Sequence, residues 1–185
     1  MNLLQLVRVG ECDPRTLDRL GPPLSQRLGV PWDVLPNVVD ADFALHGERR
    51  QYHSTELLSS MQALAGQQTW RLLGVTDNDL YIPILTFVFG EAEMGGRMAI
   101  VSTRRLRQEF YGLPGDDALF HERVLKEALH ELGHTLDLRH CEDYRCAMAA
   151  SHAVEWIDLK EAELCGACST KAAVHAQPKK RLWPF

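Results

Sequence analysis

The sequence predicts a single α/β (α+β) domain in which a mixed, twisted sheet of about five strands packs on one long helix. One observation is the alternation of strand-like and helix-like segments over the first 75 residues, which is typical of α/β folds. A second is an amphipathic segment at 117–137, whose leucines recur at the spacing of one helix face: Leu125, Leu129, Leu132 and Leu136. The length of 185 residues, with 45% hydrophobic and 24% charged residues, fits one domain.

Local signals place the elements of the first 75 residues. Asp13 suits the N-cap of a helix, Pro14 suits its first position, and Gly66 suits the C-cap of a second helix. Pro22 and Pro23 interrupt the first helix, which can resume after them. The expected order is a strand at 3–9, a helix from 14 to about 20, a strand within 38–45, a helix at 55–66 after a Ser54 or Thr55 cap, and a strand at 70–75.

The next segment is expected to form two strands joined by a loop that contains Gly95 and Gly96. Pro83 has no N–H to donate, so the first of these strands belongs at a sheet edge. The long helix should begin at an aspartate at 116–117 and run to about Asp137, and a last helix should occupy 153–164. The domain then comprises a sheet-containing part at 1–105, the long helix and its continuation at 115–140, a cysteine-rich segment at 141–170 and a tail at 171–185.

The long helix carries an H-E-x-x-H motif with a third histidine six residues further on. His130 and His134 lie four residues apart, so both imidazoles point from one helix face and can bind the same metal ion. His140 can supply a third ligand if the chain turns back after the helix, which leaves an open position for water on a tetrahedral zinc ion. Glu131 is placed to deprotonate that water. The alternative is an amphipathic helix with surface histidines.

Four of the five cysteines cluster after the third histidine. Cys141, Cys146, Cys165 and Cys168 would form a tetrahedral thiolate site, structural because protein fills all four positions. Two disulfides are the alternative, and a reducing compartment disfavours them. Cys12 stands apart and is expected to be an inert thiol. The cofactors predicted are therefore two Zn²⁺ ions per chain, one catalytic and one structural.

Charge and composition exclude several classes of partner. A net charge of −5 indicates neither nucleic-acid nor anionic-membrane binding. No apolar run is long enough to span a membrane, and the N-terminus reads as a strand without a cleavage-site pattern. We expect a cytoplasmic protein, a monomer, that acts on a peptide or protein substrate.

The motif region resembles the archaemetzincins, a family of metzincin zinc peptidases. The likeness is strongest at 129–168, where Met148 would be the methionine of the turn beneath the zinc, and it extends to 79–97. Further positions similar to that family are Ser151, Glu155, Asp158 and Lys160. One position departs: metzincins usually have glycine in a left-handed conformation three residues after the second histidine, where this chain has Asp137.

The resemblance implies a metzincin-like domain and a zinc metallopeptidase in which zinc-bound water attacks the peptide bond, with Glu131 as general base. It also implies that an edge strand binds the substrate, and Thr86, Phe87, Val88 and Phe89 resemble that strand. Aminopeptidase and endopeptidase activity both stay open. The alternative function is a catalytically silent zinc-binding structural or interaction protein on the same scaffold, for which Asp137 is the support.

Overall fold

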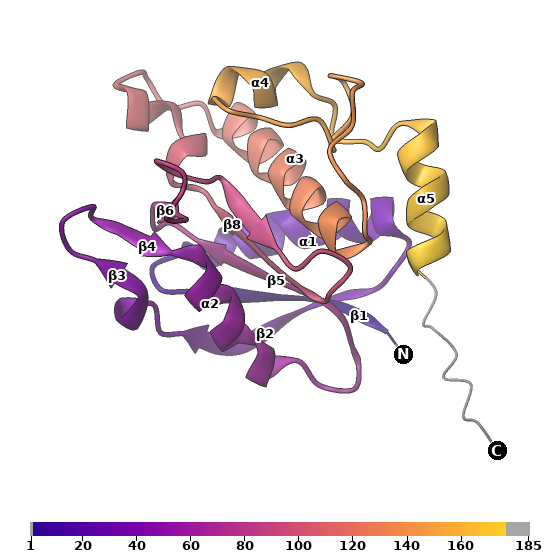
Figure 1. The fold of residues 1–185 in the computed structure, drawn as a ribbon, viewed down its shortest axis with the longest axis horizontal. Helices are drawn as coiled ribbons and strands as arrows, with labels where there is room; N and C mark the ends of the chain where they lie inside the picture. Colours follow the sequence, from indigo (N-terminus) through magenta and orange to yellow (C-terminus); the bar gives the residue numbers. More distant parts are fainter. Residues whose placement is uncertain (1, 177–185) are drawn as a thin grey trace.

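The computed structural model describes residues 2–176, which form a five-stranded mixed sheet with helices on both faces (Figure 1). The strand order is β2-β1-β5-β8-β7; neighbours from β2 to β8 are parallel, and the edge strand β7 is antiparallel to β8. These strands are β1 (Leu3–Val9), β2 (Trp32–Val39), β5 (Thr69–Thr76), β7 (Gly90–Ala92) and β8 (Met98–Ser102). A smaller sheet has the order β3-β4-β6, from β3 (Leu45–His46), β4 (Gln51–His53) and β6 (Leu80–Tyr81). The predicted fold class is confirmed.

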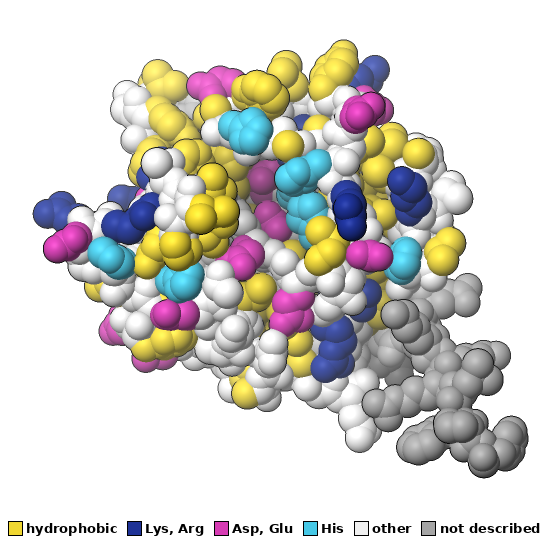
Figure 2. All heavy atoms as spheres, in the orientation of Figure 1, with side chains coloured by type: hydrophobic (Ala, Val, Ile, Leu, Met, Phe, Trp, Pro, Cys, Tyr) yellow, Lys and Arg dark blue, Asp and Glu magenta, His cyan; other side chains and the backbone are white. Residues whose placement is uncertain are grey.

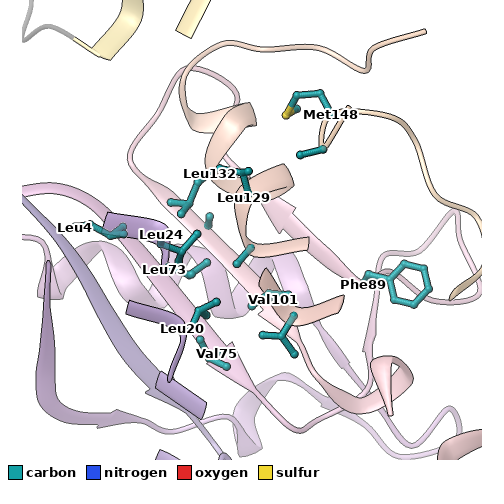
Figure 3. Packing of buried hydrophobic residues seen from close by; sticks show 14 of the residues in the cluster. Leu4, Leu20, Leu24, Leu73, Val75, Phe89, Val101, Leu129, Leu132 and Met148 are labelled. Carbon is teal, nitrogen blue, oxygen red and sulfur yellow. The ribbon is translucent and has the colours of Figure 1, made fainter. Parts of the chain in front are cut away.

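Helices cover both faces of the large sheet. α1 (Pro14–Leu28) and α3 (Asp117–Thr135) pack on one face, and α2 (Ser54–Ser60) packs on the other. Figure 3 shows how leucines of α1 and α3 meet the sheet, among them Leu24, Leu129 and Leu132 beside Leu73 and Val101. Strands β5 and β8 are buried between the two helix layers and are therefore nearly continuous apolar runs. The remaining elements are α4 (Val154–Leu159), α5 (Gly166–Ala176) and 3₁₀ turns at Asp42–Ala44, Met61–Leu64, Arg104–Leu106 and Gln108–Tyr111.

The first helix does not stop at its prolines, contrary to the sequence prediction. α1 continues through Pro22 and Pro23 to Leu28. The two prolines leave the carbonyls of Asp18 and Arg19 without helical donors, but both of those residues are exposed, so water can replace the missing N–H groups. The apolar face of the helix stays buried against the sheet and keeps the two halves in line.

Three further boundaries differ from the prediction. The helix expected at 55–66 is α2 at Ser54–Ser60, followed by the 3₁₀ turn at Met61–Leu64, and Gly66 caps neither of them. The second strand is Trp32–Val39 rather than part of 38–45, and Asp42–Ala44 is a 3₁₀ turn. The predicted helix at 153–164 ends at Leu159, and a separate helix, α5, occupies Gly166–Ala176, which includes the start of the predicted tail. The rest of that tail, 177–185, lies outside the described residues.

The expected substrate strand at Thr86–Phe89 is irregular, and the edge strand begins one residue later, at Gly90. Two side chains, one from the loop before β4 and one from β4 itself, donate hydrogen bonds to backbone carbonyls at the start of this segment and just before it. Arg49 donates to the carbonyls of Leu85 (2.7 Å) and Thr86 (3.1 Å), and Gln51 also donates to the Thr86 carbonyl (2.9 Å). Val88 makes an isolated bridge with Leu80.

None of the helices in the described part of the chain combines the length and the apolar character that crossing a bilayer requires.

Candidate metal centre and catalytic residues

The histidines of the motif converge as their spacing predicts. One ring nitrogen from each of His130, His134 and His140 lies within 4.8 Å of the other two. His130 Nδ1 donates to the Ala147 carbonyl (2.8 Å) and His134 Nδ1 to the Leu138 carbonyl (2.7 Å). Each of these bonds fixes the orientation of a ring and leaves the lone pair of its Nε2 available to bind a metal.

The geometry of the two helix histidines fits a metal ion. Their Nε2 atoms face each other at 3.1 Å. Burial lowers the pKa of both His130 and His134, so both rings are neutral, and with Nδ1 protonated each Nε2 presents a lone pair. Two lone pairs at this distance repel unless a cation lies between them. Tetrahedral zinc with Zn–N bonds of about 2.0 Å separates its nitrogen ligands by about 3.3 Å, close to the observed distance.

His140 reaches the site through a tight turn at the end of α3. Asp137 adopts a left-handed conformation with φ of 61°. Leu138 N–H donates to the Gly133 carbonyl (3.1 Å) and Asp137 N–H to the His134 carbonyl (3.0 Å). This is the Schellman pattern, with aspartate at the position that glycine usually takes. The chain therefore makes the reversal that the third histidine requires.

Met148 lies beneath this end of the helix and is fully buried. A Cβ built on Gly133 would lie 2.2 Å from the Met148 sulfur, so the absence of a side chain at Gly133 makes room for the thioether. The carbonyl of the preceding residue, Ala147, accepts a hydrogen bond from His130. The backbone carbonyl of Met148 accepts one from Cys141 N–H (2.9 Å). The methionine segment thus supports the first histidine and the chain that follows the third.

Glu131 lies at the wall of a cleft of about 580 Å³ beside the histidines. Figure 2 shows acidic and histidine side chains gathered in the hollow on this face. Glu131 is 5% exposed, and burial, followed by the charge of Glu127, raises the pKa of its carboxyl well above 4.5. Strand β7 passes close to it, since a Cβ on Gly90 would lie 2.7 Å from Glu131 Oε1. A carboxylate in this position can accept a proton in a water-poor site.

Glu127, one turn before Glu131, is buried and not on a solvated helix face. Lys160, just after α4, donates to Glu127 Oε1 (3.1 Å) in an ion pair whose members are both at most 3% exposed. No hydrogen bond joins Glu127 to His130 among the described residues, because His130 Nδ1 bonds to a carbonyl. Glu127 lies three residues before His130 on the motif face of α3, but no local sequence signal connects it with Lys160.

The four clustered cysteines also converge. The Sγ atoms of Cys141, Cys146, Cys165 and Cys168 lie within 4.8 Å of one another, and all four thiols are free of disulfides. The Cys141–Cys165 distance is 3.8 Å, which matches the edge of a tetrahedron with Zn–S bonds of about 2.3 Å. Hydrogen bonds from the Cys168 N–H and from neighbouring thiols lower the pKa of Cys165 to about 7, whereas burial raises the pKa of Cys146 and Cys168. These residues could hold a second ion.

Comparisons with known proteins agree with this geometry. The model of peptidase family M54 matches residues 22–173. An archaemetzincin from Methanocaldococcus jannaschii is 39% identical over 163 residues, which is 88% of each chain. A crystal structure of archaemetzincin from Methanopyrus kandleri has a TM-score of 0.81 and 36% identity over 94% of both chains. A zinc-dependent peptidase from Methanocorpusculum labreanum has a TM-score of 0.83 and 26% identity, covering 91% of this chain and 99% of that one. The chain therefore belongs to peptidase family M54, the archaemetzincins, a family of zinc metallopeptidases.

Proposed function

We propose that this chain hydrolyses peptide bonds in the cleft beside Glu131, with His130, His134 and His140 holding the catalytic zinc. The observation that carries the proposal is the pair of Nε2 lone pairs facing each other at 3.1 Å, each fixed by its Nδ1 bond to a carbonyl. A zinc ion held there would supply a Lewis acid and lower the pKa of water from 15.7 toward about 7.

Glu131 acts as the general base. Its carboxylate lies on the cleft wall between α3 and the Gly90 backbone, where it takes a proton from the attacking water. The same carboxyl then gives the proton to the leaving amine. Gly90 has a direct part in this arrangement, because any side chain at this position would occupy the space of the Glu131 carboxylate.

The substrate binds along the edge strand β7. Ser102 N–H donates to the Phe89 carbonyl (2.8 Å), and hydrogen-bonded pairs alternate along an antiparallel ladder. Gly90 and Ala92 therefore direct their N–H and C=O groups away from β8, toward the cleft. A peptide added to this edge gains backbone hydrogen bonds whatever its side chains. The segment Thr86–Phe89, first expected to be this strand, instead contributes side chains to the cleft lining.

The second zinc ion, on Cys141, Cys146, Cys165 and Cys168, is structural. It joins the segment after His140 to the start of α5, and it adds to two backbone hydrogen bonds that link these parts, from Ala147 N–H to the Glu163 carbonyl and from Glu161 N–H to the Arg145 carbonyl. Its removal should cost folding stability as well as activity, since the binding free energy of a structural zinc is folding free energy.

The test is cleavage of an unbiased peptide mixture, read by mass spectrometry, with zinc-loaded protein and its Glu131→Gln variant. Metal analysis should find two zinc ions in both proteins, and cuts should disappear in the variant. Cut positions also separate removal of N-terminal residues from internal cleavage. Equal cleavage by both proteins would show that Glu131 is not the general base. If neither protein cleaves peptides although both ions are bound, the catalytically silent scaffold is favoured. That alternative requires a distorted turn at Asp137, whereas the turn in the structure is regular.

A further inference from the structure

The turn that returns His140 to the site carries an unfavourable residue. The left-handed region is strained for a residue that has a Cβ, and Asp137 adopts it with φ of 61°. The Schellman bonds of Asp137 and Leu138 form whichever residue occupies the position, so they do not offset this cost specifically. Some other contact must hold the last turn of α3 in place.

Two contacts from the sheet reach this end of the helix. Arg71 on β5 donates from Nε to Thr135 Oγ1 (2.9 Å) and from Nη2 to the Thr135 carbonyl (3.1 Å). Gly95, in the loop between β7 and β8, donates its N–H to the carbonyl of His134 (2.9 Å). The last two residues of α3 before the turn are therefore bonded to the sheet from outside the helix.

Arg71 is itself held in a single orientation. Its Nη1 donates to the Trp70 carbonyl (2.8 Å), and its guanidinium lies over the Trp70 ring at 4.8 Å. No carboxylate lies within 4.0 Å of the Arg71 guanidinium among the described residues, although ion pairs are frequent elsewhere in the chain. Its positive charge instead meets the negative end of the α3 dipole, where a cation stabilises the helix terminus.

We propose that Arg71 is a positioning residue for the catalytic metal centre. By clamping Thr135 it holds the last turn of α3 so that Asp137 stays left-handed and His140 comes back to His130. The clamp compensates for the absence of glycine at position 137. This inference rests on the proposed function, because it assigns His140 to the zinc.

The compensation predicts a coupling between positions 71 and 137. Glycine at 137 enters the left-handed region at little cost, so the turn no longer depends on the clamp. Arg71→Leu should lower zinc affinity at the histidine site by about 5- to 30-fold, the factor that corresponds to the cost of holding a non-glycine residue in the left-handed region. In the Asp137→Gly background the same substitution should lower it by less than about threefold if the cost of the turn is removed.

The experiment measures zinc affinity by chelator competition for the wild type, Arg71→Leu, Asp137→Gly and the double variant. Arg97→Leu is the matched control, because Arg97 is the neighbouring arginine and donates to Thr69 without touching α3. It should leave the affinity unchanged. Arg71→Lys replaces the leucine variant if that variant does not fold, since lysine keeps the charge but lacks the two donors that reach Thr135 together.

A second readout does not depend on zinc at the histidines. Hydrogen exchange of the Asp137 and Leu138 amides should accelerate in Arg71→Leu and stay slow in the double variant. Equal effects of Arg71→Leu in the wild-type and Asp137→Gly backgrounds would overturn the proposal and leave Arg71 a helix cap alone. Unchanged exchange at these amides would also overturn it. The two substitutions could also be coupled in the hydrogen exchange of these amides while no zinc binds at the histidines. That result would reject the proposed function and confirm the clamp on the turn.

Discussion

The buried Glu127–Lys160 pair should make Lys160→Met one of the most destabilising single substitutions in the chain. Both side chains are at most 3% exposed, so the substitution leaves an unpaired carboxylate inside the protein. Breaking a buried pair in this way costs about 3–5 kcal/mol. For 185 residues the unfolding entropy is roughly 0.4 kcal/mol/K, so a loss of about 4 kcal/mol lowers Tm by roughly 10 °C.

Thermal and urea denaturation at fixed zinc concentration measures this effect. The double variant Lys160→Met/Glu127→Leu removes both charges and should recover most of the loss, because an apolar replacement of a buried pair is often neutral or stabilising. Arg145→Met is the matched control, as its pair with Glu161 is exposed and should leave Tm unchanged. A Tm for Lys160→Met within about 2 °C of the wild type, which corresponds to less than about 1 kcal/mol, would refute the reasoning.

The same pair predicts a direction for the effect of pH. Burial raises the pKa of Glu127 above 4.5, and Lys160 opposes that rise. Without Lys160 the folded-state pKa rises further, so above 4.5 the folded protein keeps a proton that the unfolded chain releases. Stability then falls as pH rises through this window. The penalty of Lys160→Met relative to the double variant should therefore shrink as the pH is lowered from 7 toward 5, and a penalty independent of pH would contradict this.

Two further substitutions test the packing around the site, and one reaction tests the burial of the isolated Cys12. Gly90→Ala should lower kcat on the order of 100-fold with zinc content unchanged, because its Cβ would lie 2.5 Å from the Ile100 carbonyl and 2.7 Å from Glu131 Oε1, so that the edge strand or the base must shift. Gly133→Ala should cost about 1–3 kcal/mol in a urea titration, since its Cβ would lie 2.2 Å from the Met148 sulfur. Cys12 should resist iodoacetamide at pH 8 in the folded protein and react in urea, because burial raises the pKa of its thiol to about 12.

Each of these has a control or a contrary result. Gly66→Ala is the control for both glycine variants, as a Cβ there has no neighbour within 4 Å and should alter neither kcat nor stability appreciably. Full activity of Gly90→Ala would mean that Glu131 tolerates displacement or is not the base. Rapid alkylation of native Cys12 would show that its thiol is more accessible than the structure indicates.

Local patterns in the sequence were enough for the elements that form the site. The leucine stripe of α3 and the four-residue spacing of His130 and His134 depend on neighbours along the chain, so helical geometry already determines which side chains share a face. The cysteines were recognised by their clustering in the sequence, but the tertiary structure brings the two pairs together. Asp137 stands where metzincins usually have a left-handed glycine, and it adopts the left-handed conformation itself.

Contacts between distant segments could be decided only by the tertiary structure. Lys160 meets Glu127 from 33 positions away and Arg71 meets Thr135 from 64 away, distances at which no periodicity links residues. The segment Thr86–Phe89 has the composition of a strand, but its Thr86 carbonyl accepts from the side chains of Arg49 and Gln51. Helix α1 continues through its prolines where the residues whose carbonyls lose a helical donor are exposed. Propensity describes what a segment prefers in isolation, whereas burial and hydrogen-bond partners depend on which other segments the fold brings beside it.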